Sequence, residues 1–354
     1  MRPLFATIHS TALRHNLGVV RRRAPRAKVM AIIKANAYGH GCARAAGALA
    51  EADGFGLLEL DAAVALRESG VQQRIVLIEG FFHPSELALI IEHRLSVVVH
   101  SPEQVRMLEE VQAGAQLDVL LKVNTGMNRL GLSPARYEEA RKRLERNAAV
   151  SGVTLMTHFA EADEARGVEW QMERLRRLPG YETLPRSLAN SAAILRFPET
   201  HDGWVRPGIM LYGCSPFAEQ AGEDLGLKPA MTLESRLIAV QELQPGESVG
   251  YGGLFRAQQR MRIGVVACGY ADGYPRHAPT GTPVEVAGRM TGTVGRVSMD
   301  MLCVDLGPVP DARPGARVVL WGGGVPVERV AAASGTVGYQ LLCAVAPRVR
   351  IVEG

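Results

Sequence analysis

The chain has 354 residues, 47% hydrophobic and 21% charged, a composition that excludes a disordered chain and favours two globular domains over one core. Its net charge of +4 comes from 40 basic and 36 acidic residues, so it lacks the strong basic excess of a nucleic-acid-binding protein. Its five cysteines are odd in number, scattered and never arranged as C-x-x-C, which favours buried thiols over disulfides or a zinc site, and we expect no metal.

We expect no targeting segment at the start of the chain. MRPLFATIHSTALRHN has no apolar stretch long enough for a signal peptide, and no later segment approaches the length of a membrane span. A cytoplasmic protein without membrane contact is therefore expected. The most basic run, Arg21 to Arg23 with Arg26, lies on one face of a predicted helix and favours a solvated surface over nucleic-acid binding.

Up to about residue 215, short apolar runs alternate with longer stretches of helical period. Helical patterns cover 61–69, 102–111 and 134–147. Eight runs have the character of strands: 29–33, 54–58, 75–78, 96–99, 119–123, 153–156, 187–189 and 203–205. This α/β alternation predicts an N-terminal (β/α)8 TIM-type barrel, although the weak last two runs leave a doubly wound open sheet as an alternative.

After about residue 228 the sequence becomes rich in glycine, proline and short β-type segments, with one helical pattern at 327–334. A C-terminal, mainly β domain is therefore predicted. We place the two domains at 1–228 and 229–354, and expect that the first few residues can pack with the second.

Functional groups of a parallel barrel collect at the C-terminal ends of its strands. This rule alone selects Lys34, the stretch 124–129, His158, Asn190 with Ser191, and Arg206. Lys34 ends the apolar run VMAII, so its amine is expected in the barrel mouth, partly desolvated, where imine chemistry is favoured. A strand-end lysine that reaches solvent is the alternative, and its neighbours decide between them.

Those neighbours form the segment KANAYGHG at 34–41, which resembles the pyridoxal-phosphate lysine motif of alanine racemases. The likeness continues through LKVNTGMNRLG at 121–131, THFA at 157–160, LANSAA at 188–193, WVRPGIMLYG at 204–213, VGYG at 249–252, GYADGYPR at 269–276 and GRVSMDM at 295–301. It is closest to the proteobacterial members. The resemblance implies an isomerase that uses pyridoxal 5'-phosphate, a barrel of the third fold type with a β domain, and a head-to-tail homodimer with shared active sites.

The resemblance also implies two acid/base residues on opposite faces of the bound substrate. Lys34 carries the cofactor and handles the Cα proton of the D-enantiomer, and Tyr251 of the partner subunit handles that of the L-enantiomer. A phenol ordinarily ionises near pH 10, so a tyrosine that acts as a base at neutral pH requires nearby positive charge or hydrogen-bond donors.

The cofactor is expected to meet residues from several motifs. The resemblance assigns Tyr38 and Ser191 to the phosphate with Asn190 alongside, His158 to the neighbourhood of the ring, and Arg206 to the pyridine nitrogen. Pro207, Gly208 and Ile209 have the form of a helix start, whose free N–H groups suit a phosphate. Arginine does not surrender its proton, so Arg206 is expected to keep the ring nitrogen neutral and to favour reprotonation over transamination.

The substrate carboxylate is expected to pair with Arg129 and, by resemblance, with the backbone amide of Met299 from the partner subunit. In the family, the residue at Lys122 is often carboxylated and hydrogen-bonds the arginine. Two positions depart from some members: Ser298 stands where they have cysteine, and Pro347 lies near their phosphate-binding tyrosine. Cofactor affinity is expected to be lower than in those relatives.

The predicted function is the interconversion of L- and D-alanine, which either supplies D-alanine for peptidoglycan or degrades alanine. A broad-specificity amino-acid racemase of the same fold is an alternative, although such enzymes are usually exported. A non-catalytic pyridoxal-phosphate-binding protein on a lone barrel is another, but that class lacks a second domain. A related decarboxylase is disfavoured because its aspartate- and cysteine-bearing motifs are missing.

Overall fold

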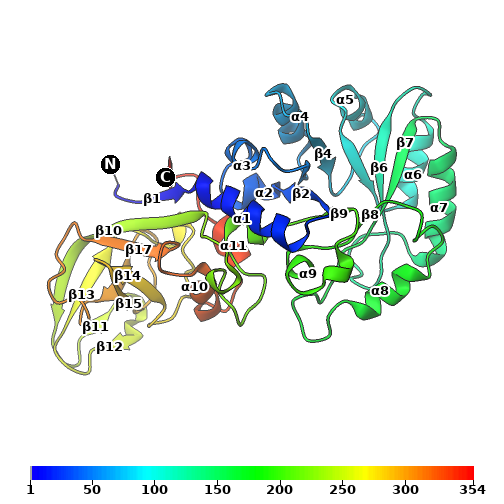
Figure 1. Cartoon of the computed structure of the whole chain (residues 1–354). Helices are drawn as coiled ribbons and strands as arrows, with labels where there is room; N and C mark the ends of the chain where they lie inside the picture. Colours follow the sequence, from blue (N-terminus) through cyan, green and yellow to red (C-terminus); the bar gives the residue numbers. More distant parts are fainter. Residues whose placement is uncertain (1) are drawn as a thin grey trace. The chain divides into compact units, whose positions relative to one another are not determined.

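The computed structural model describes residues 2–354, which form two compact units (Figure 1). One unit comprises Leu17–Ala37 and Gly41–Gly208. The other comprises the residues up to Asn16, Tyr38–His40 and Ile209–Gly354. Within residues 2–354, no helix combines the length and the apolar content that crossing a bilayer requires.

The first unit is a closed barrel of eight parallel strands. The strands are β2 (Lys28–Ile32), β3 (Gly54–Leu57), β4 (Arg74–Leu77), β5 (Ser96–Val99), β6 (Leu117–Lys122), β7 (Val150–Met156), β8 (Arg186–Ser187) and β9 (Trp204–Val205). They pair in chain order, and β9 closes the ring by pairing with β2. The predicted (β/α)8 barrel is confirmed and the open-sheet alternative is wrong, because even the two weakest runs supply the pairs that close the ring.

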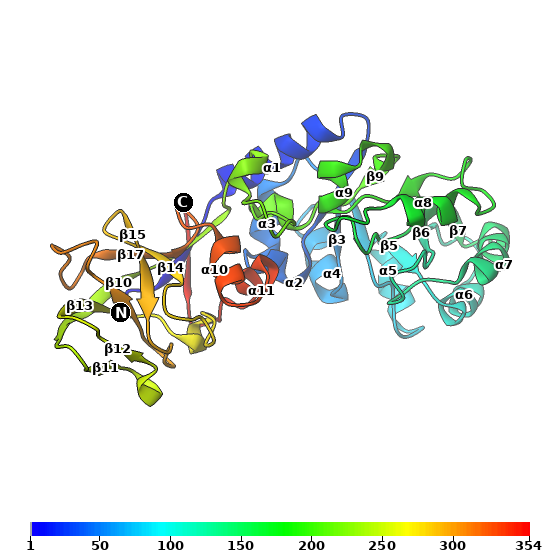
Figure 2. The ribbon, with the colours of Figure 1, turned by 90° about the horizontal axis from the view of Figure 1, so that it is seen from below.

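Helices surround these strands (Figure 2). They are α3 (Cys42–Ala48), α4 (Leu60–Glu68), α5 (Glu86–Glu92), α6 (Pro102–Glu109), α7 (Pro134–Arg146), α8 (Glu169–Arg176) and α9 (Ser191–Arg196), while α1 (Ser10–Arg23) precedes β2. The middles of the longer strands are mostly apolar because both of their faces are covered; Val97, Val98 and Val99 of β5, for example, are 0% exposed. Residues at the strand ends are therefore the ones left to face the barrel mouth.

The second unit is mainly β, as predicted. Six strands, β10 (Met231–Leu243), β13 (Met261–Val266), β14 (Pro283–Val286), β15 (Arg289–Val294), β16 (Leu302–Asp305) and β17 (Arg317–Trp321), form a ring that closes because β10 pairs with both β13 and β17. A short hairpin of β11 (Ser248–Val249) and β12 (Phe255–Arg256) stands apart from this sheet. Helix α10 (Val327–Ala333) matches the predicted helical pattern, and α11 (Gly338–Cys343) was not predicted.

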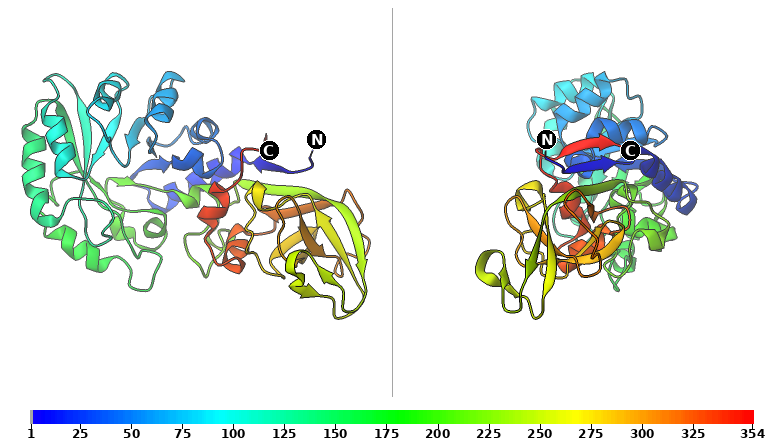
Figure 3. Two further views of the ribbon diagram at one scale, coloured as in Figure 1. Left: turned by 180° about the vertical axis from the view of Figure 1, so that it is seen from behind. Right: turned by 90° about the vertical axis from the view of Figure 1, so that its left-hand side faces the viewer.

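The two ends of the chain meet in this unit. Strand β1 (Phe5–Ile8) pairs antiparallel with β10, and β18 (Arg350–Glu353) pairs parallel with β1 (Figure 3). Neither strand was predicted from the sequence. A strand of only four residues carries too little periodicity to be recognised without the strands that pair with it.

Candidate active site

Lys34 directly follows the first barrel strand and opens an unusual turn. Ala35, Asn36, Ala37 and Tyr38 all have positive φ, between 51° and 53°, so four consecutive non-glycine residues are left-handed. This conformation costs about 1 kcal/mol or more per residue. Asn36 offsets part of that cost, since its side-chain oxygen accepts a hydrogen bond from Cys42 N (2.9 Å) and its carbonyl accepts one from Gly41 N (2.9 Å). The turn changes the chain direction at once after Lys34, and nothing in the sequence analysis predicted it.

The amine of Lys34 forms no hydrogen bond or ion pair with any of residues 2–354. It belongs to a group of cations that all act on His158. Burial lowers the pKa of His158 well below its ordinary value, and the charges of Arg206, Lys122, Arg129 and Lys34 lower it further. The imidazole is therefore neutral at pH 7. A barrel mouth that gathers four cations is electrostatically suited to bind anions.

Arg206 follows β9 and is 4% exposed. Its Nη1 donates to the carbonyl oxygen (2.6 Å) and hydroxyl (2.9 Å) of Ser187, and its Nη2 donates to Thr157 O (2.7 Å) and lies 3.5 Å from His158 Nδ1. Its Nε donates to no atom of residues 2–354. Burial lowers the pKa of Arg206 to about 10, so the guanidinium keeps its charge at neutral pH. Arg206 is thus held rigidly by its two Nη atoms, and its Nε–H remains available to donate a hydrogen bond to a ligand.

Lys122 is the last residue of β6 and is 6% exposed. Burial, followed by the charges of Arg206, Arg129 and Lys34, lowers its pKa to about 8, while Glu79 acts in the opposite direction. Roughly a tenth of this amine is therefore uncharged at pH 7. An uncharged amine is the form that reacts with electrophiles.

Arg129 lies on the loop that follows β6, which several backbone bonds fold back on itself. Leu132 N donates to Lys122 O (2.9 Å), and the side-chain oxygen of Asn124 accepts from both Gly126 N and Asn128 N (3.0 Å each). Asn128 has a φ of 57°, which asparagine tolerates better than most residues. The guanidinium of Arg129 is exposed and contacts no acceptor among residues 2–354. A loop ordered by its own hydrogen bonds therefore carries a cation that is available to bind an anion.

Asn190 and Ser191 form the start of α9. The Asn190 side chain accepts from Ala193 N (3.0 Å) and donates to Phe159 O (3.4 Å), so its amide is committed to holding this turn. The Ser191 hydroxyl accepts from Gly208 N (2.9 Å). The predicted helix start at Pro207 differs in detail: a 3-10 helix begins at Ile209, and the Gly208 amide already has an acceptor.

Tyr38 is 7% exposed in the second unit. Its ring stacks on Tyr212, with 4.6 Å between centroids, and lies 6.1 Å from the ring of Tyr339. Burial raises the pKa of Tyr38, so its phenol stays protonated and acts as a hydrogen-bond donor.

Tyr251 lies at the tip of the β11–β12 hairpin and is 70% exposed. Gly250, Gly252 and Gly253 around it all have positive φ, so the VGYGG segment is glycine-rich because the tip requires left-handed residues. Met299 is 53% exposed on another loop of the same unit. Its carbonyl accepts from Ala271 N (3.0 Å), whereas its own amide donates to no atom of residues 2–354.

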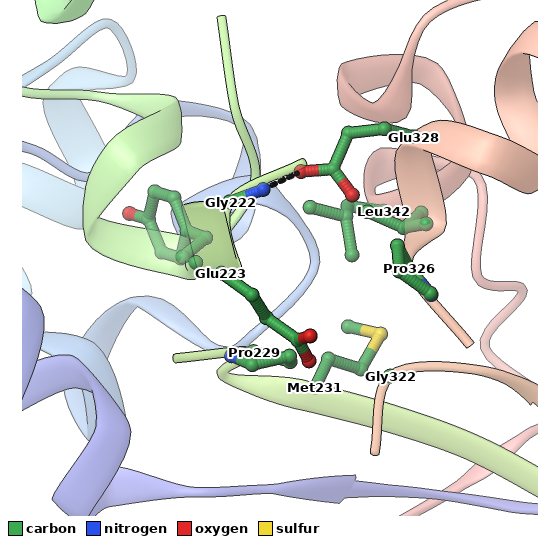
Figure 4. Close-up of a pocket in the computed structure, with 11 residues that line it drawn as sticks. Gly222, Glu223, Pro229, Met231, Gly322, Pro326, Glu328 and Leu342 are labelled. Atoms are coloured by element: carbon green, nitrogen blue, oxygen red, sulfur yellow. Dashed lines mark hydrogen bonds between the residues drawn. The ribbon is translucent and has the colours of Figure 1, made fainter. Parts of the chain in front are cut away.

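A small pocket in the second unit has a different character (Figure 4). Glu328 on α10 accepts from Gly222 N (2.9 Å) and Ser215 N (2.6 Å), and this holds the segment before β10 against the helix. The described lining includes Glu223 and Glu328 but no lysine, arginine or histidine. The cavity is therefore unsuited to an anionic ligand, and we assign it a structural role.

Comparison with known proteins decides the family. A family model described as "Alanine racemase, N-terminal domain" matches residues 8–216, and one described as "Alanine racemase, C-terminal domain" matches residues 230–353. The chain belongs to the alanine racemase family. The resemblance inferred from the motifs is confirmed.

Relatives named alanine racemase match along almost the whole chain. One from Nitrosospira multiformis is 60% identical over 354 residues, and one from Klebsiella aerogenes, named as catabolic, is 54% identical; each alignment covers 99% of both chains. The crystal structure of a biosynthetic alanine racemase from Pseudomonas aeruginosa has a TM-score of 0.96 and 47% identity, with both chains fully covered. Barrel and β unit thus both have counterparts in solved members of the family.

The donor set of the barrel fits the pyridoxal phosphate expected of an alanine racemase. The mouth offers a lysine amine for the aldehyde, a buried arginine with one available N–H, a neutral histidine and a serine hydroxyl. Its surplus of positive charge matches an anionic phosphate and a substrate carboxylate. The ligand chemistry of these residues is therefore consistent with the cofactor.

One residue that supports this site was not predicted from the sequence. Gln171 on α8 is 0% exposed and hydrogen-bonds residues after both β6 and β7. A buried glutamine within a helical pattern gives no sequence signal beyond its polarity. Only the fold brings it to the two loops.

Proposed function

We propose that this protein interconverts L- and D-alanine with pyridoxal 5'-phosphate bound to Lys34. The observation that carries the proposal is the lysine amine without a protein partner in a barrel mouth where Arg129 and Arg206 supply further positive charge. When bound, the cofactor withdraws electrons from the substrate Cα, which makes its proton acidic enough for a side chain to remove.

Two residues handle that proton. Lys34 removes or returns the Cα proton of the D-enantiomer on one face of the substrate. Tyr251 of a second subunit does the same for the Cα proton of the L-enantiomer on the opposite face.

The remaining barrel residues orient the cofactor and the substrate. Arg206 donates from Nε to the pyridine nitrogen, and the neutral His158 lies beside the ring. The phosphate would be held by Tyr38, by the Ser191 hydroxyl with Asn190 alongside, and by the Ile209 amide, while the Gly208 amide donates to Ser191 and steadies that hydroxyl.

The substrate carboxylate pairs with Arg129 and with the backbone amide of Met299 from the second subunit. Fixing the carboxylate orients the Cα–H bond relative to the cofactor ring, and this orientation speeds the removal of the proton. Lys122 carries a carboxylate formed from carbon dioxide, and this anion orients Arg129. The low pKa of Lys122, about 8, supports that assignment, because only the neutral amine reacts.

A homodimer with shared sites forms part of the proposal. Large apolar or aromatic side chains stand exposed on neighbouring motifs of the β unit: Tyr251 is 70% exposed, Leu254 67%, Met299 53% and Met301 44%. Exposed groups of this size favour coverage by another protein surface. A second copy covers them and receives Tyr251 in its barrel mouth.

Subunit mixing tests the mechanism and the dimer together. Lys34→Ala and Tyr251→Phe proteins are each expected to be inactive. If the sites are shared, a mixed dimer contains one site with both native residues, and random mixing restores about a quarter of the native rate. A mixture without activity, with exchange of subunits verified, contradicts shared sites.

The same preparations serve for the substrate range. L-alanine, lysine, arginine and serine are each assayed, and comparable rates on all four favour the broad-specificity racemase instead. Borohydride reduction followed by peptide mapping checks that the cofactor is attached to Lys34.

A further inference from the structure

Gln171 on α8 joins the loops that follow two adjacent barrel strands. Its Nε2 donates to Thr125 Oγ1 (2.6 Å) and to His158 O (3.1 Å), and its Oε1 accepts from Ala160 N (2.7 Å). Thr125 belongs to the loop after β6, whereas His158 and Ala160 follow β7. The side chain is 0% exposed, so these bonds form away from water and are costly to break.

Thr125 is held from further directions. Its hydroxyl lies 2.8 Å from that of Thr157, which in turn donates to Val123 O (3.0 Å), and each threonine is 1% exposed. Arg174, one turn along α8 from Gln171, donates to Thr125 O (2.9 Å). The buried network therefore fixes the first residues of the loop through both side chain and backbone.

Close packing adds to these bonds. A Cβ built on Gly126 would come within 2.2 Å of the Trp170 ring. The indole of this α8 residue therefore packs directly against the loop backbone. Arg166 and Arg174 both lie over the same ring, at 4.2 and 5.1 Å from its centroid. One face of α8 thus clamps the start of the loop that carries Arg129.

Arg129 itself has no acceptor among residues 2–354, so its position depends on how the loop backbone is anchored. Asn124 supports the loop from within, and α8 supports it from outside. Anchoring of this kind is what holds a binding group within the small tolerance that productive orientation allows.

We propose that Gln171 is a positioning residue for the substrate carboxylate. Its bond to Thr125 fixes the loop that carries Arg129. Its bonds to the backbone of His158 and Ala160 hold that loop at a fixed place relative to the loop after β7. The inference rests on the proposed role of Arg129. Loss of the Gln171 bonds leaves the charge of Arg129 in place but lets its guanidinium move.

The first test variant is Gln171→Met, which keeps the side-chain length and removes both polar ends. The probe is propionate, a carboxylate of the size of alanine without the amine, titrated calorimetrically into the cofactor-loaded protein. We expect its affinity to fall about tenfold, and KM for both alanine enantiomers to rise by a similar factor while kcat changes less. The absorbance of the bound cofactor is expected to stay as in the native protein.

Gln104→Met is the matched control. Gln104 on α6 is 4% exposed and joins the loops after β4 and β5 in the same manner, accepting from His100 N (2.8 Å) and donating to Phe81 O (3.0 Å). Its replacement is expected to lower stability about as much as Gln171→Met and to leave propionate affinity unchanged. Equal losses of affinity in both variants would mean that general loosening of the barrel, and not the Arg129 loop, is responsible, and would overturn the proposal.

Thr125 provides a second route should Gln171→Met fail to fold. Thr125→Val removes the hydroxyl at constant shape and is expected to weaken propionate binding, whereas Thr125→Ser keeps the hydroxyl and should restore it. Arg129→Met distinguishes the proposed role of Arg129 from that of Gln171. If Arg129→Met leaves propionate affinity unchanged, the proposed role of Arg129 fails; if it lowers the affinity while Gln171→Met and Thr125→Val do not, the positioning role alone is wrong.

Discussion

Nη2 of Arg206 lies 3.5 Å from Nδ1 of His158, so a buried guanidinium faces a ring nitrogen that is kept unprotonated. The pair fits in the barrel because only one member is charged. Protonating His158 would place a second cation directly beside Arg206 in a desolvated space, with the charge of Lys34 acting against it as well.

This relationship predicts a specific acid sensitivity. The pKa of His158 in the folded protein is lower than in the unfolded chain, so the unfolded state binds the proton first as the pH falls. The stability due to neutral His158 is therefore complete above about pH 6.5 and declines below it, by at most about 1.4 kcal/mol per pH unit. Denaturant midpoints of the cofactor-free protein, measured between about pH 5 and 7, should fall less steeply in His158→Gln.

His83→Gln, at an exposed histidine, is the control and should keep the native pH dependence. His9 and His100 also have pKa values lowered by burial, so part of the slope is expected to remain in the His158 variant. A slope identical to that of the native protein would show that His158 does not contribute to it.

Arg206 is expected to control the outcome of the reaction as well as the position of the ring. Glutamate at this position can share a proton with the pyridine nitrogen, so Arg206→Glu should raise the ratio of transamination to racemisation about tenfold or more. Both this variant and Arg206→Gln lose the bonds to Ser187 and Thr157, and each is expected to destabilise the barrel by about 3 kcal/mol or more.

The ratio of the two products, measured in one reaction mixture, does not depend on how much protein is folded. Arg206→Gln removes the guanidinium without adding a carboxylate and should keep the native ratio. Equal ratios for glutamate and glutamine would contradict the assigned role of Arg206 at the ring nitrogen.

Lys122 is expected to take up labelled carbon dioxide. With 13C-bicarbonate, the native protein should give a carbamate signal that disappears on acidification, because protonation of an amine whose pKa is about 8 removes the reactive form. Lys122→Met should lack the signal and bind propionate about tenfold more weakly, since Arg129 loses its anionic partner. Lys142→Met, at an exposed lysine of α7, should retain both properties.

The barrel was predictable from sequence because strands buried on both faces appear as continuous apolar runs, and the end of each run located Lys34, His158 and Arg206. The motifs then pointed to Tyr251 and Met299, which composition does not distinguish from ordinary surface residues. Among the features that escaped prediction are β1 and β18, which are defined by the pairing of β1 with both β10 and β18. The others include Gln171, whose partners lie 11 to 46 residues away, and the left-handed turn after Lys34. Each depends on tertiary contacts that local pattern does not encode.

The left-handed turn predicts an unusual response to glycine. Replacing an exposed helical alanine by glycine costs about 1 kcal/mol, because glycine loses more backbone entropy on folding. At Ala35, which is exposed and has a φ of 51°, the Cβ instead opposes the native conformation by about 1 to 2 kcal/mol. The two effects have opposite signs, so Ala35→Gly should leave stability unchanged or raise it by about 1 kcal/mol.

Ala65→Gly, at an exposed position within the right-handed helix α4, is the control and should lose about 1 kcal/mol. Ala35→Val should lose more than the control, because a β-branched side chain is disfavoured at positive φ. Chemical denaturation of the three variants without cofactor gives the comparison. If Ala35→Gly is destabilised as much as Ala65→Gly, the turn after Lys34 is not left-handed in solution, and the amine is not held by the backbone geometry described here.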